Sequence, residues 1–340
     1  MSKDQGSGSA DVIGRPVADA VEAVLAEDSA DSRDRETVRT TLERVAEDGV
    51  VSESGIEAAL AELSKVVSTP ETRIEFAAIE LADARETAEA EGVADLEIVR
   101  SRMDAFESRL NTVQARIDGL GPELRELIDR RDEGDVYAVA TGSRELEAEA
   151  NELHRAADEL GVELEEFGRW LTDPETRYDE LEEEVEAVED SLEGLAGTVE
   201  GLATAVEGDD EGVTRGAARG APPADPGVAW ADATLRTRVT SLLVADLRAE
   251  LADLRGWPSE GADGADTARL DDAEARLDRL GGRCRSLAER LDGLARPAWT
   301  DRFGDRLDGF EAAMEEVDPP VDWGEVEAEL ERYREDVGAA

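Results

Sequence analysis

The amino-acid sequence predicts an all-α protein: an elongated coiled coil and helical bundle with a small N-terminal helical module and a C-terminal helical bundle. The main observation is a heptad stripe, in which apolar residues alternate at steps of three and four and so share one face of a coiled-coil helix. Nothing in the chain alternates with period two for long enough to predict a strand. The stripe consists of Tyr178, Leu181, Val185, Val188, Leu192, Leu195, Val199, Leu202 and Val206.

Acidic residues dominate the composition, because the 340 residues carry 86 Asp and Glu against 37 Lys and Arg, a formal net charge of -49. Apolar residues still make up 40% of the chain, and their periodic placement is not typical of a disordered acidic tail. Only Lys3 and Lys65 are lysines, and the carboxylates extend over most of the chain. This pattern favours adaptation to molar intracellular salt over the binding of basic partners. We therefore expect a soluble, cytoplasmic protein of a haloarchaeon.

The pattern of the first 90 residues predicts a disordered tail over residues 1–10 and a module of short helices over residues 11–90. The tail lacks the apolar core of a signal peptide. Thr69, Pro70 and Glu71 resemble an N-cap, a proline at the first helical position and an early acid, which predicts the start of a fourth helix. The apolar stripes of the four expected helices span residues 17–25, 38–45, 56–66 and 74–81.

A second heptad stripe predicts long coiled-coil helices over residues 91–207. Gly119, Gly121 and Pro122 interrupt it and predict a kink or short break near Leu120. The stripe consists of Leu96, Val99, Met103, Phe106, Leu110, Val113, Ile117, Leu120, Leu124 and Leu127.

Residues 130–143 contain two glycines, and the apolar stripe that follows them has a different phase. This predicts a turn that joins two antiparallel helices. Asp173 and Pro174 cap the next helix, and the sequence leaves open whether they mark a kink or a reversal. Residues 208–228 predict a flexible linker, since Gly, Ala and Pro interrupt the periodicity there.

Residues 229–340 predict a bundle of four amphipathic helices. No apolar run in the chain approaches the roughly 18 residues that span a bilayer, so we expect no membrane insertion. The four apolar stripes span residues 235–254, 270–294, 303–317 and 323–333.

Two helices within residues 36–67 have the layout of a helix-turn-helix DNA-binding module. The second helix opens with acidic residues at Glu53 and Glu57, where DNA contacts need basic or amide side chains. The intervening loop resembles half an EF-hand, but with Gly49 at its sixth position none of positions one, three and twelve is a carboxylate. We therefore expect a packing module there, with neither DNA nor calcium bound.

Five arginines gather on one C-terminal helix and allow two hypotheses, a phosphate-binding face or docking against the acidic arm of the same chain. Interleaved Asp and Glu residues match ordinary intrahelical pairing, so we favour docking and expect no nucleic acid. The five are Arg276, Arg279, Arg283, Arg285 and Arg290.

His154 and Cys284 are the single histidine and the single cysteine of the chain. His154 has no neighbouring histidine or cysteine with which to form a metal or nucleophilic site. Cys284 falls on an apolar heptad position, which predicts a small buried side chain. The acidic run of residues 182–184 is interpreted as solvated. We therefore predict a protein that is not an enzyme, with no catalytic, cofactor-binding or metal site and no cofactor.

Two segments, SKVVSTPETR at residues 64–73 and EEFGRWLTDPETRY at residues 165–178, resemble a haloarchaeal family named halo transducer proteins. The resemblance covers about residues 11–206. It implies an acidic cytoplasmic coiled-coil protein, its name implies signalling, and no active-site residues come with it.

From these observations we expect a non-enzymatic interaction or signalling scaffold that binds protein partners, or a second copy, through its heptad seams. The alternative is a chromosome-associated or cell-architecture coiled-coil protein. The sequence leaves open the oligomeric state and whether the seams close within one chain.

Overall fold

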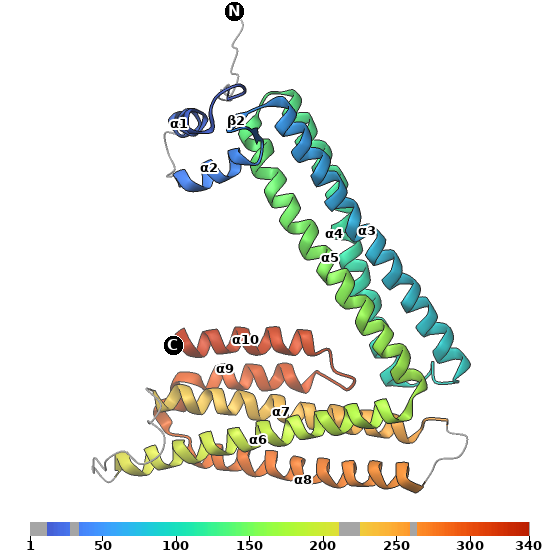
Figure 1. Ribbon diagram of the computed structural model, residues 1–340. Coiled ribbons are helices and arrows are strands. Elements are labelled where there is room, and N and C mark those ends of the chain that lie inside the picture. The colour runs from blue at the N-terminus through green and yellow to red at the C-terminus, as the bar shows by residue number, and fades with distance from the viewer. Residues whose placement is uncertain (1–11, 28–33, 211–224, 259–263, 340) are drawn as a thin grey trace, which may run out of the picture. The chain divides into compact units, whose positions relative to one another are not determined.

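The computed structural model describes residues 12–27, 34–210, 225–258 and 264–339 (Figure 1). The predicted tail at residues 1–10 lies outside these ranges, as do residues 211–224 of the predicted linker. The described residues form ten α-helices and one two-stranded sheet, which confirms the all-α prediction.

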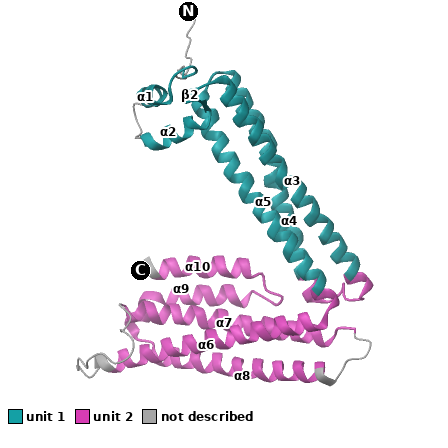
Figure 2. Cartoon of the chain, viewed as in Figure 1, with its two compact units in different colours: residues 1–87, 102–169 teal, residues 88–101, 170–340 magenta. Residues whose placement is uncertain are grey.

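The chain divides into two compact units, which Figure 2 distinguishes by colour. Unit 1 comprises residues 1–87 and 102–169, and unit 2 comprises residues 88–101 and 170–340. This division differs from the predicted domains 11–90, 91–207 and 229–340. The reason is that the helix with the heptad stripe from Tyr178 to Val206 packs against the C-terminal helices, as described below.

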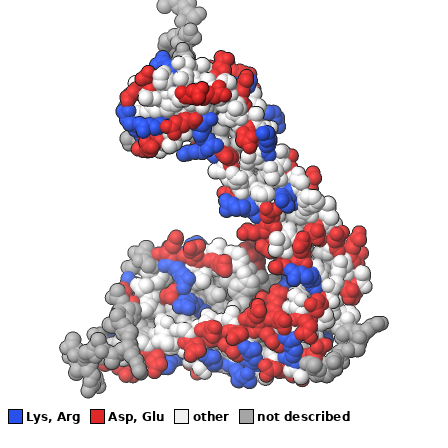
Figure 3. Space-filling model, viewed as in Figure 1, with Lys and Arg blue, Asp and Glu red and all other residues white. Residues whose placement is uncertain are grey.

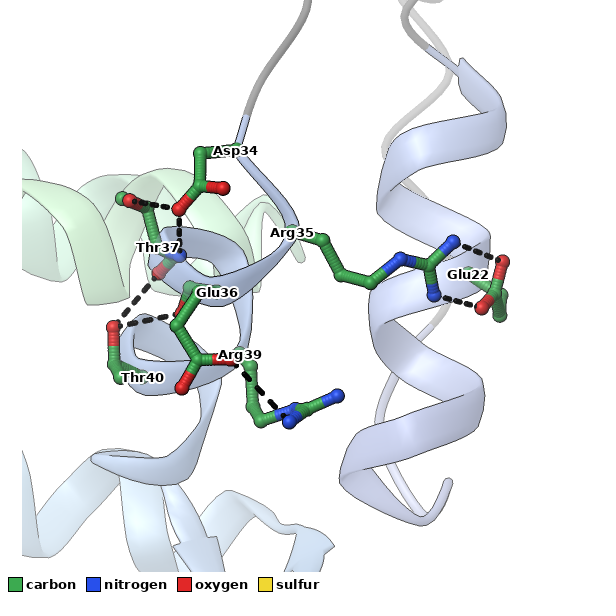
Figure 4. A network of polar contacts seen from close by, with 7 residues as sticks. All are labelled: Glu22, Asp34, Arg35, Glu36, Thr37, Arg39 and Thr40. Carbon is green, nitrogen blue, oxygen red and sulfur yellow. Dashed lines mark hydrogen bonds and ion pairs between the residues drawn. The ribbon is translucent and has the colours of Figure 1, made fainter.

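Unit 1 begins with α1 (Val17–Glu27) and α2 (Arg35–Glu43). Asp34 caps α2, because its carboxylate accepts hydrogen bonds of 3.0 Å from both the backbone N–H and the hydroxyl of Thr37 (Figure 4). These bonds lower the pKa of Asp34. Arg35 reaches across to α1 and pairs with Glu22, which lowers the pKa of that carboxyl. The cap stabilises the start of α2, and the ion pair joins the two helices at the surface.

A small β-hairpin follows α2, with β1 (Ala46–Glu47) antiparallel to β2 (Val50–Val51). Its two turn residues, Asp48 and Gly49, both have positive φ, at 50° and 78°, as a type I′ turn requires. The hairpin was not predicted, since each strand is too short to alternate, although the Asp-Gly pair is a hairpin signal. It lies between α2 and α3, so the short turn of a helix-turn-helix module is not present there.

Helix α3 runs without a break from Glu53 to Ala90 and contains Pro70. The prediction that a new helix starts at Pro70 is therefore wrong. A buried stripe with heptad spacing continues straight through the proline, so packing outweighs the roughly 3 kcal/mol that an interior proline costs. The stripe consists of Leu60, Leu63, Val67, Pro70, Ile74, Ala77, Leu81, Ala84 and Ala88.

Helices α4 (Glu97–Asp132) and α5 (Val136–Thr172) are joined by a short turn at Gly134, whose φ is 86°. The predicted turn within residues 130–143 is thus confirmed. The predicted break near Leu120 is not observed, because α4 continues through the exposed Pro122.

Ion pairs show how α3, α4 and α5 align in unit 1. Arg116 on α4 pairs with Glu149 and Glu152 on α5, while Arg109, two turns earlier on α4, pairs with Glu163 farther along α5. This order makes α4 and α5 antiparallel, as predicted. Helix α3 is also antiparallel to α4 and therefore runs parallel to α5 (Figure 1). The three helices share one apolar core with α1, α2 and the hairpin.

Unit 2 contains α6 (Pro174–Asp210), α7 (Pro226–Arg255) and α8 (Gly264–Leu294), which pack against one another. The predicted heptad stripe is the buried face of α6: its positions from Leu181 to Leu202 are at most 1% exposed. That face is therefore covered within the chain, by α7 and α8. Cys284 on α8 is buried as predicted, and burial raises the pKa of its thiol.

Helices α9 (Pro297–Glu315) and α10 (Trp323–Ala339) complete unit 2 and confirm the four predicted C-terminal helices. Asp246 on α7 anchors the start of α10. One carboxylate oxygen accepts from the backbone N–H of Val321 at 3.0 Å, and the other accepts from the indole N–H of Trp323 at 2.8 Å.

Gly55, at the start of α3, is expected to tolerate no side chain. A Cβ there would lie 2.7 Å from the carbonyl carbon of Val45, a backbone atom that cannot move aside. We expect Gly55→Ala to lower the free energy of unfolding by about 2 kcal/mol. Gly119→Ala is the control, because a Cβ at Gly119 would meet nothing within 4 Å, and we expect a gain of about 0.5–1 kcal/mol. Equal effects of the two substitutions in urea unfolding would contradict the steric argument.

Candidate interaction site

The two positions considered for catalysis, His154 and Cys284, belong to different compact units. His154 on α5 contacts Asp158 one turn later, with 3.3 Å between His154 Nε2 and the carboxylate. Cys284 is buried in unit 2, and the described Asp, Glu, His and Cys side chains do not gather in threes that could hold a metal ion. The structure thus assembles no reactive group from the residues that the sequence singled out.

Of the five arginines that the docking hypothesis named, Arg276 contacts α6. Arg276 forms a bidentate pair with Glu189, both N–O distances being 3.0 Å. Arg269, which the sequence analysis did not include, binds Glu182 at 2.7 Å, Asp179 at 2.6 Å and Glu175 at 3.2 Å. Both arginines are thereby occupied within the chain. The other four arginines that the sequence singled out are all exposed: Arg279, Arg283, Arg285 and Arg290.

These contacts also account for part of the acidic run at residues 182–184. Glu182 is a partner of Arg269, whereas Glu183 is exposed as predicted. Figure 3 shows carboxylates densely spread over unit 2, with arginines between them.

Loss of Arg276 is expected to free the carboxylate of Glu189. The hydrogen bond from Arg276 holds the pKa of Glu189 below its ordinary value, so the pair stabilises the fold at neutral pH and that contribution is lost as the pH falls through the lowered pKa. We expect Arg276→Ala to cost about 1 kcal/mol at pH 7 and to return the pKa of Glu189 towards about 4.3. Arg290→Ala is the control, because Arg290 is exposed on the same helix and is not among the groups that lower the pKa of Glu189. An unchanged Glu189 pKa by NMR titration would contradict this assignment.

A buried arginine occupies the start of α6 in unit 2. The Arg177 side chain is 4% exposed and donates to the carbonyl oxygens of Trp170 at 2.7 Å and Leu171 at 3.1 Å, in the last turn of α5. Its guanidinium carbon lies 4.1 Å from the ring centre of Trp257. Burial lowers the pKa of Arg177, and nearby acidic groups partly oppose this, but an arginine stays protonated in proteins.

Around Arg177, the end of α7 contacts both the α5–α6 connection and the start of α4. Trp257, after α7, packs edge-on against Trp170 with 5.2 Å between ring centres. Asp253 on α7 accepts a 2.8 Å hydrogen bond from the backbone N–H of Ile98, at the first turn of α4. Together these contacts tie residues 88–101 and the α5–α6 connection to α7. The hydrogen bonds among them satisfy backbone groups at helix ends, so we assign these contacts a role in stabilising the fold.

Three large apolar side chains are exposed on unit 1: Phe76 at 57% and Ile79 at 54% on α3, and Val162 at 55% on α5. Arg73 on α3 pairs with Asp158 on α5 at 3.2 Å. Phe76 lies three residues beyond Arg73 and Val162 four beyond Asp158, about 4.5 Å and 6 Å along parallel helices. Phe76 and Val162 therefore lie at the same level, with Ile79 one turn on. Phe76 and Ile79 share the outer face of α3, and we call these two residues the exposed apolar patch.

The exposed apolar patch is the site that sequence reasoning missed. Phe76 and Ile79 are out of phase with the buried stripe of α3, so they fall on the polar face of an amphipathic helix. Of the described residues, only Val162 on α5, at 55%, and Ile13, at 38%, are also exposed large apolar side chains. Two large apolar side chains one turn apart on a surface otherwise rich in carboxylates form a candidate interaction site.

No protein-family model, no curated protein and no solved structure matches this chain. Over the described ranges, none of the helices has both the length and the apolarity that a membrane crossing requires.

Proposed function

We propose that this chain is a non-enzymatic helical interaction protein of a haloarchaeal cytoplasm, acting as a scaffold in signalling or a related process. The observation that carries the proposal is the exposed apolar patch. Elsewhere the apolar stripes of α3 and α6 are covered within the chain, whereas the patch is left open on a regular three-helix surface. Such a rigid helical face suits recognition of another protein.

The acidic composition supports the proposed habitat. At molar salt the Debye length is about 3 Å, so the carboxylates repel one another little and the contact between proteins must depend on apolar surface. The resemblance of residues 64–73 and 165–178 to haloarchaeal proteins agrees with this habitat. For the chromosome-associated alternative, Arg269 and Arg276 are not free to bind phosphate, since carboxylates of α6 engage them.

Photo-crosslinking in a haloarchaeal host tests the proposal. A photoreactive amino acid in place of Phe76 is expected to crosslink to a protein, either a different one or a second copy. The same amino acid in place of Ser108, an exposed polar position on α4, is the control and is expected to give no defined product. Absence of any crosslink specific to position 76 would refute the proposal.

A further inference from the structure

We propose that the outer face of α3 is a homodimer interface, in which the α3 helices of two copies pair in antiparallel orientation. The inference rests on the proposed function as an interaction protein and names its partner, a second copy of this chain.

The outer face of α3 has the spacing of a coiled-coil seam. Its residues follow steps of three and four, on the side opposite to the buried stripe, and all of them are exposed: Thr69, Thr72, Phe76, Ile79, Asp83 and Glu86. The centre of this face, Phe76 and Ile79, is apolar, and its two ends are polar. The opposite face of α3 is buried in unit 1, so the outer face is available for a second helix.

Symmetry matches this face to itself. A twofold axis that crosses α3 between Ala77 and Ala78 sets Phe76 of one copy opposite Ile79 of the other, and does so twice. The same axis sets each Thr72 opposite Asp83 of the second copy, where a hydroxyl can donate to a carboxylate. Such an isologous arrangement uses one patch on both copies and closes at the dimer.

The charges along α3 select the antiparallel orientation. Cationic side chains lie along the first half of the outer face at Lys65 and Arg73, which are exposed although each also pairs within its own chain. Carboxylates occupy the second half at Glu80, Asp83 and Glu86. Antiparallel pairing brings Arg73 to within about 3 Å, along the helix axis, of Glu80 of the second copy. Parallel pairing would instead set Asp83 against Asp83 and Glu86 against Glu86.

High salt favours this contact over one with a basic partner. Two chains of charge -49 each repel at long range in dilute buffer, and molar KCl screens that repulsion while leaving the apolar contact intact. A basic partner that is held by the carboxylates of α3 would bind more weakly as salt is added. The dimer is therefore expected to form more strongly with increasing KCl.

Light scattering coupled to size exclusion tests the dimer on the full chain in molar KCl. We expect twice the chain mass of 36.6 kDa and a return to one chain mass in Phe76→Asp, with unchanged helical circular dichroism. Ile13→Asp, at an exposed apolar residue outside α3, is the matched control and should stay dimeric. A monomer over about a hundredfold range of concentration, or a dimeric Phe76→Asp, overturns the inference.

Disulfide crosslinking tests the orientation, because the one native cysteine, Cys284, is buried. We expect an equal mixture of Thr72→Cys and Asp83→Cys chains to crosslink on oxidation and neither variant to crosslink alone. A dimer that crosslinks through Asp83→Cys alone is parallel and refutes the pairing. If the chain is monomeric but position 76 still photo-crosslinks to a different protein, the dimer is refuted and the proposed function stands.

Discussion

Transfer of the folded protein from molar KCl to about 0.01 M KCl, where the Debye length grows from about 3 Å to about 30 Å, is expected to unfold it. The reason is the formal net charge of -49 on 340 residues, which covers both units with carboxylates. Two like charges about 7 Å apart repel by roughly 0.6 kcal/mol in water without screening. A few dozen such pairs exceed the 5–15 kcal/mol by which a typical protein is stable, and the unfolded chain relieves them by expanding.

Circular dichroism at decreasing KCl concentration measures this loss, and tryptophan fluorescence separates the two units. All five tryptophans belong to unit 2: Trp170, Trp230, Trp257, Trp299 and Trp323. The fluorescence therefore follows unit 2, whereas the dichroism follows both units. Retention of full helicity at about 0.01 M KCl would show that self-repulsion does not limit this fold.

A charge-reversed variant separates screening from other effects of salt. Glu183, Glu186 and Asp190 are exposed on α6, and their replacement by Lys changes the net charge by six. We expect this triple variant to need less KCl for folding. Sorbitol, which does not screen charge, should not replace KCl. If it restores the fold equally well, the salt acts through the solvation of apolar surface instead.

The sequence predicted which residues are buried better than it predicted what covers them. The seam of α6 is buried at the positions that its heptad spacing indicates, from Leu181 to Leu202. A heptad defines a face but not its partner, so the spacing did not show that α7 and α8 cover it. The domain boundary expected at residues 208–228 differs from the observed division for the same reason.

Local signals misled where packing outweighed them. Pro70 and Pro122 lie inside α3 and α4 because the apolar faces continue through both prolines. The hairpin at Asp48 and Gly49 was missed because its strands are too short to alternate. The exposed apolar patch could have been found from phase alone, since Phe76 and Ile79 repeat at heptad spacing opposite the buried stripe.

Arg177 shows what periodicity cannot predict. It lies beside Tyr178, the first position of the α6 stripe, and a charged side chain next to a seam is ordinarily solvated. Its burial depends on two carbonyl groups at the end of α5 and on Trp257, which is 80 residues away in sequence. Only the fold brings these groups together.

Replacement of Arg177 by Ala is expected to lower the free energy of unfolding of unit 2 by about 3 kcal/mol. Hydrogen bonds from a charged donor contribute about 1.5–3 kcal/mol each, and contact between a guanidinium and the face of Trp257 adds about 1–2 kcal/mol where water is excluded. The cost of burying the charge offsets part of this sum. In the variant, the carbonyl groups of Trp170 and Leu171 lose these donors at the end of α5.

Urea unfolding in molar KCl, followed by tryptophan fluorescence, measures the effect in unit 2. Arg279→Ala is the matched control, because Arg279 is exposed on α8 of the same unit, and we expect a change within about 0.5 kcal/mol. Arg177→Lys should fall between the two, since an ammonium group lacks the planar fork that reaches both carbonyls and stacks on Trp257. If Arg177→Ala and Arg279→Ala are equally stable, the hydrogen bonds of Arg177 only balance the cost of burying its charge. The α5–α6 connection is then stabilised by packing and not by Arg177.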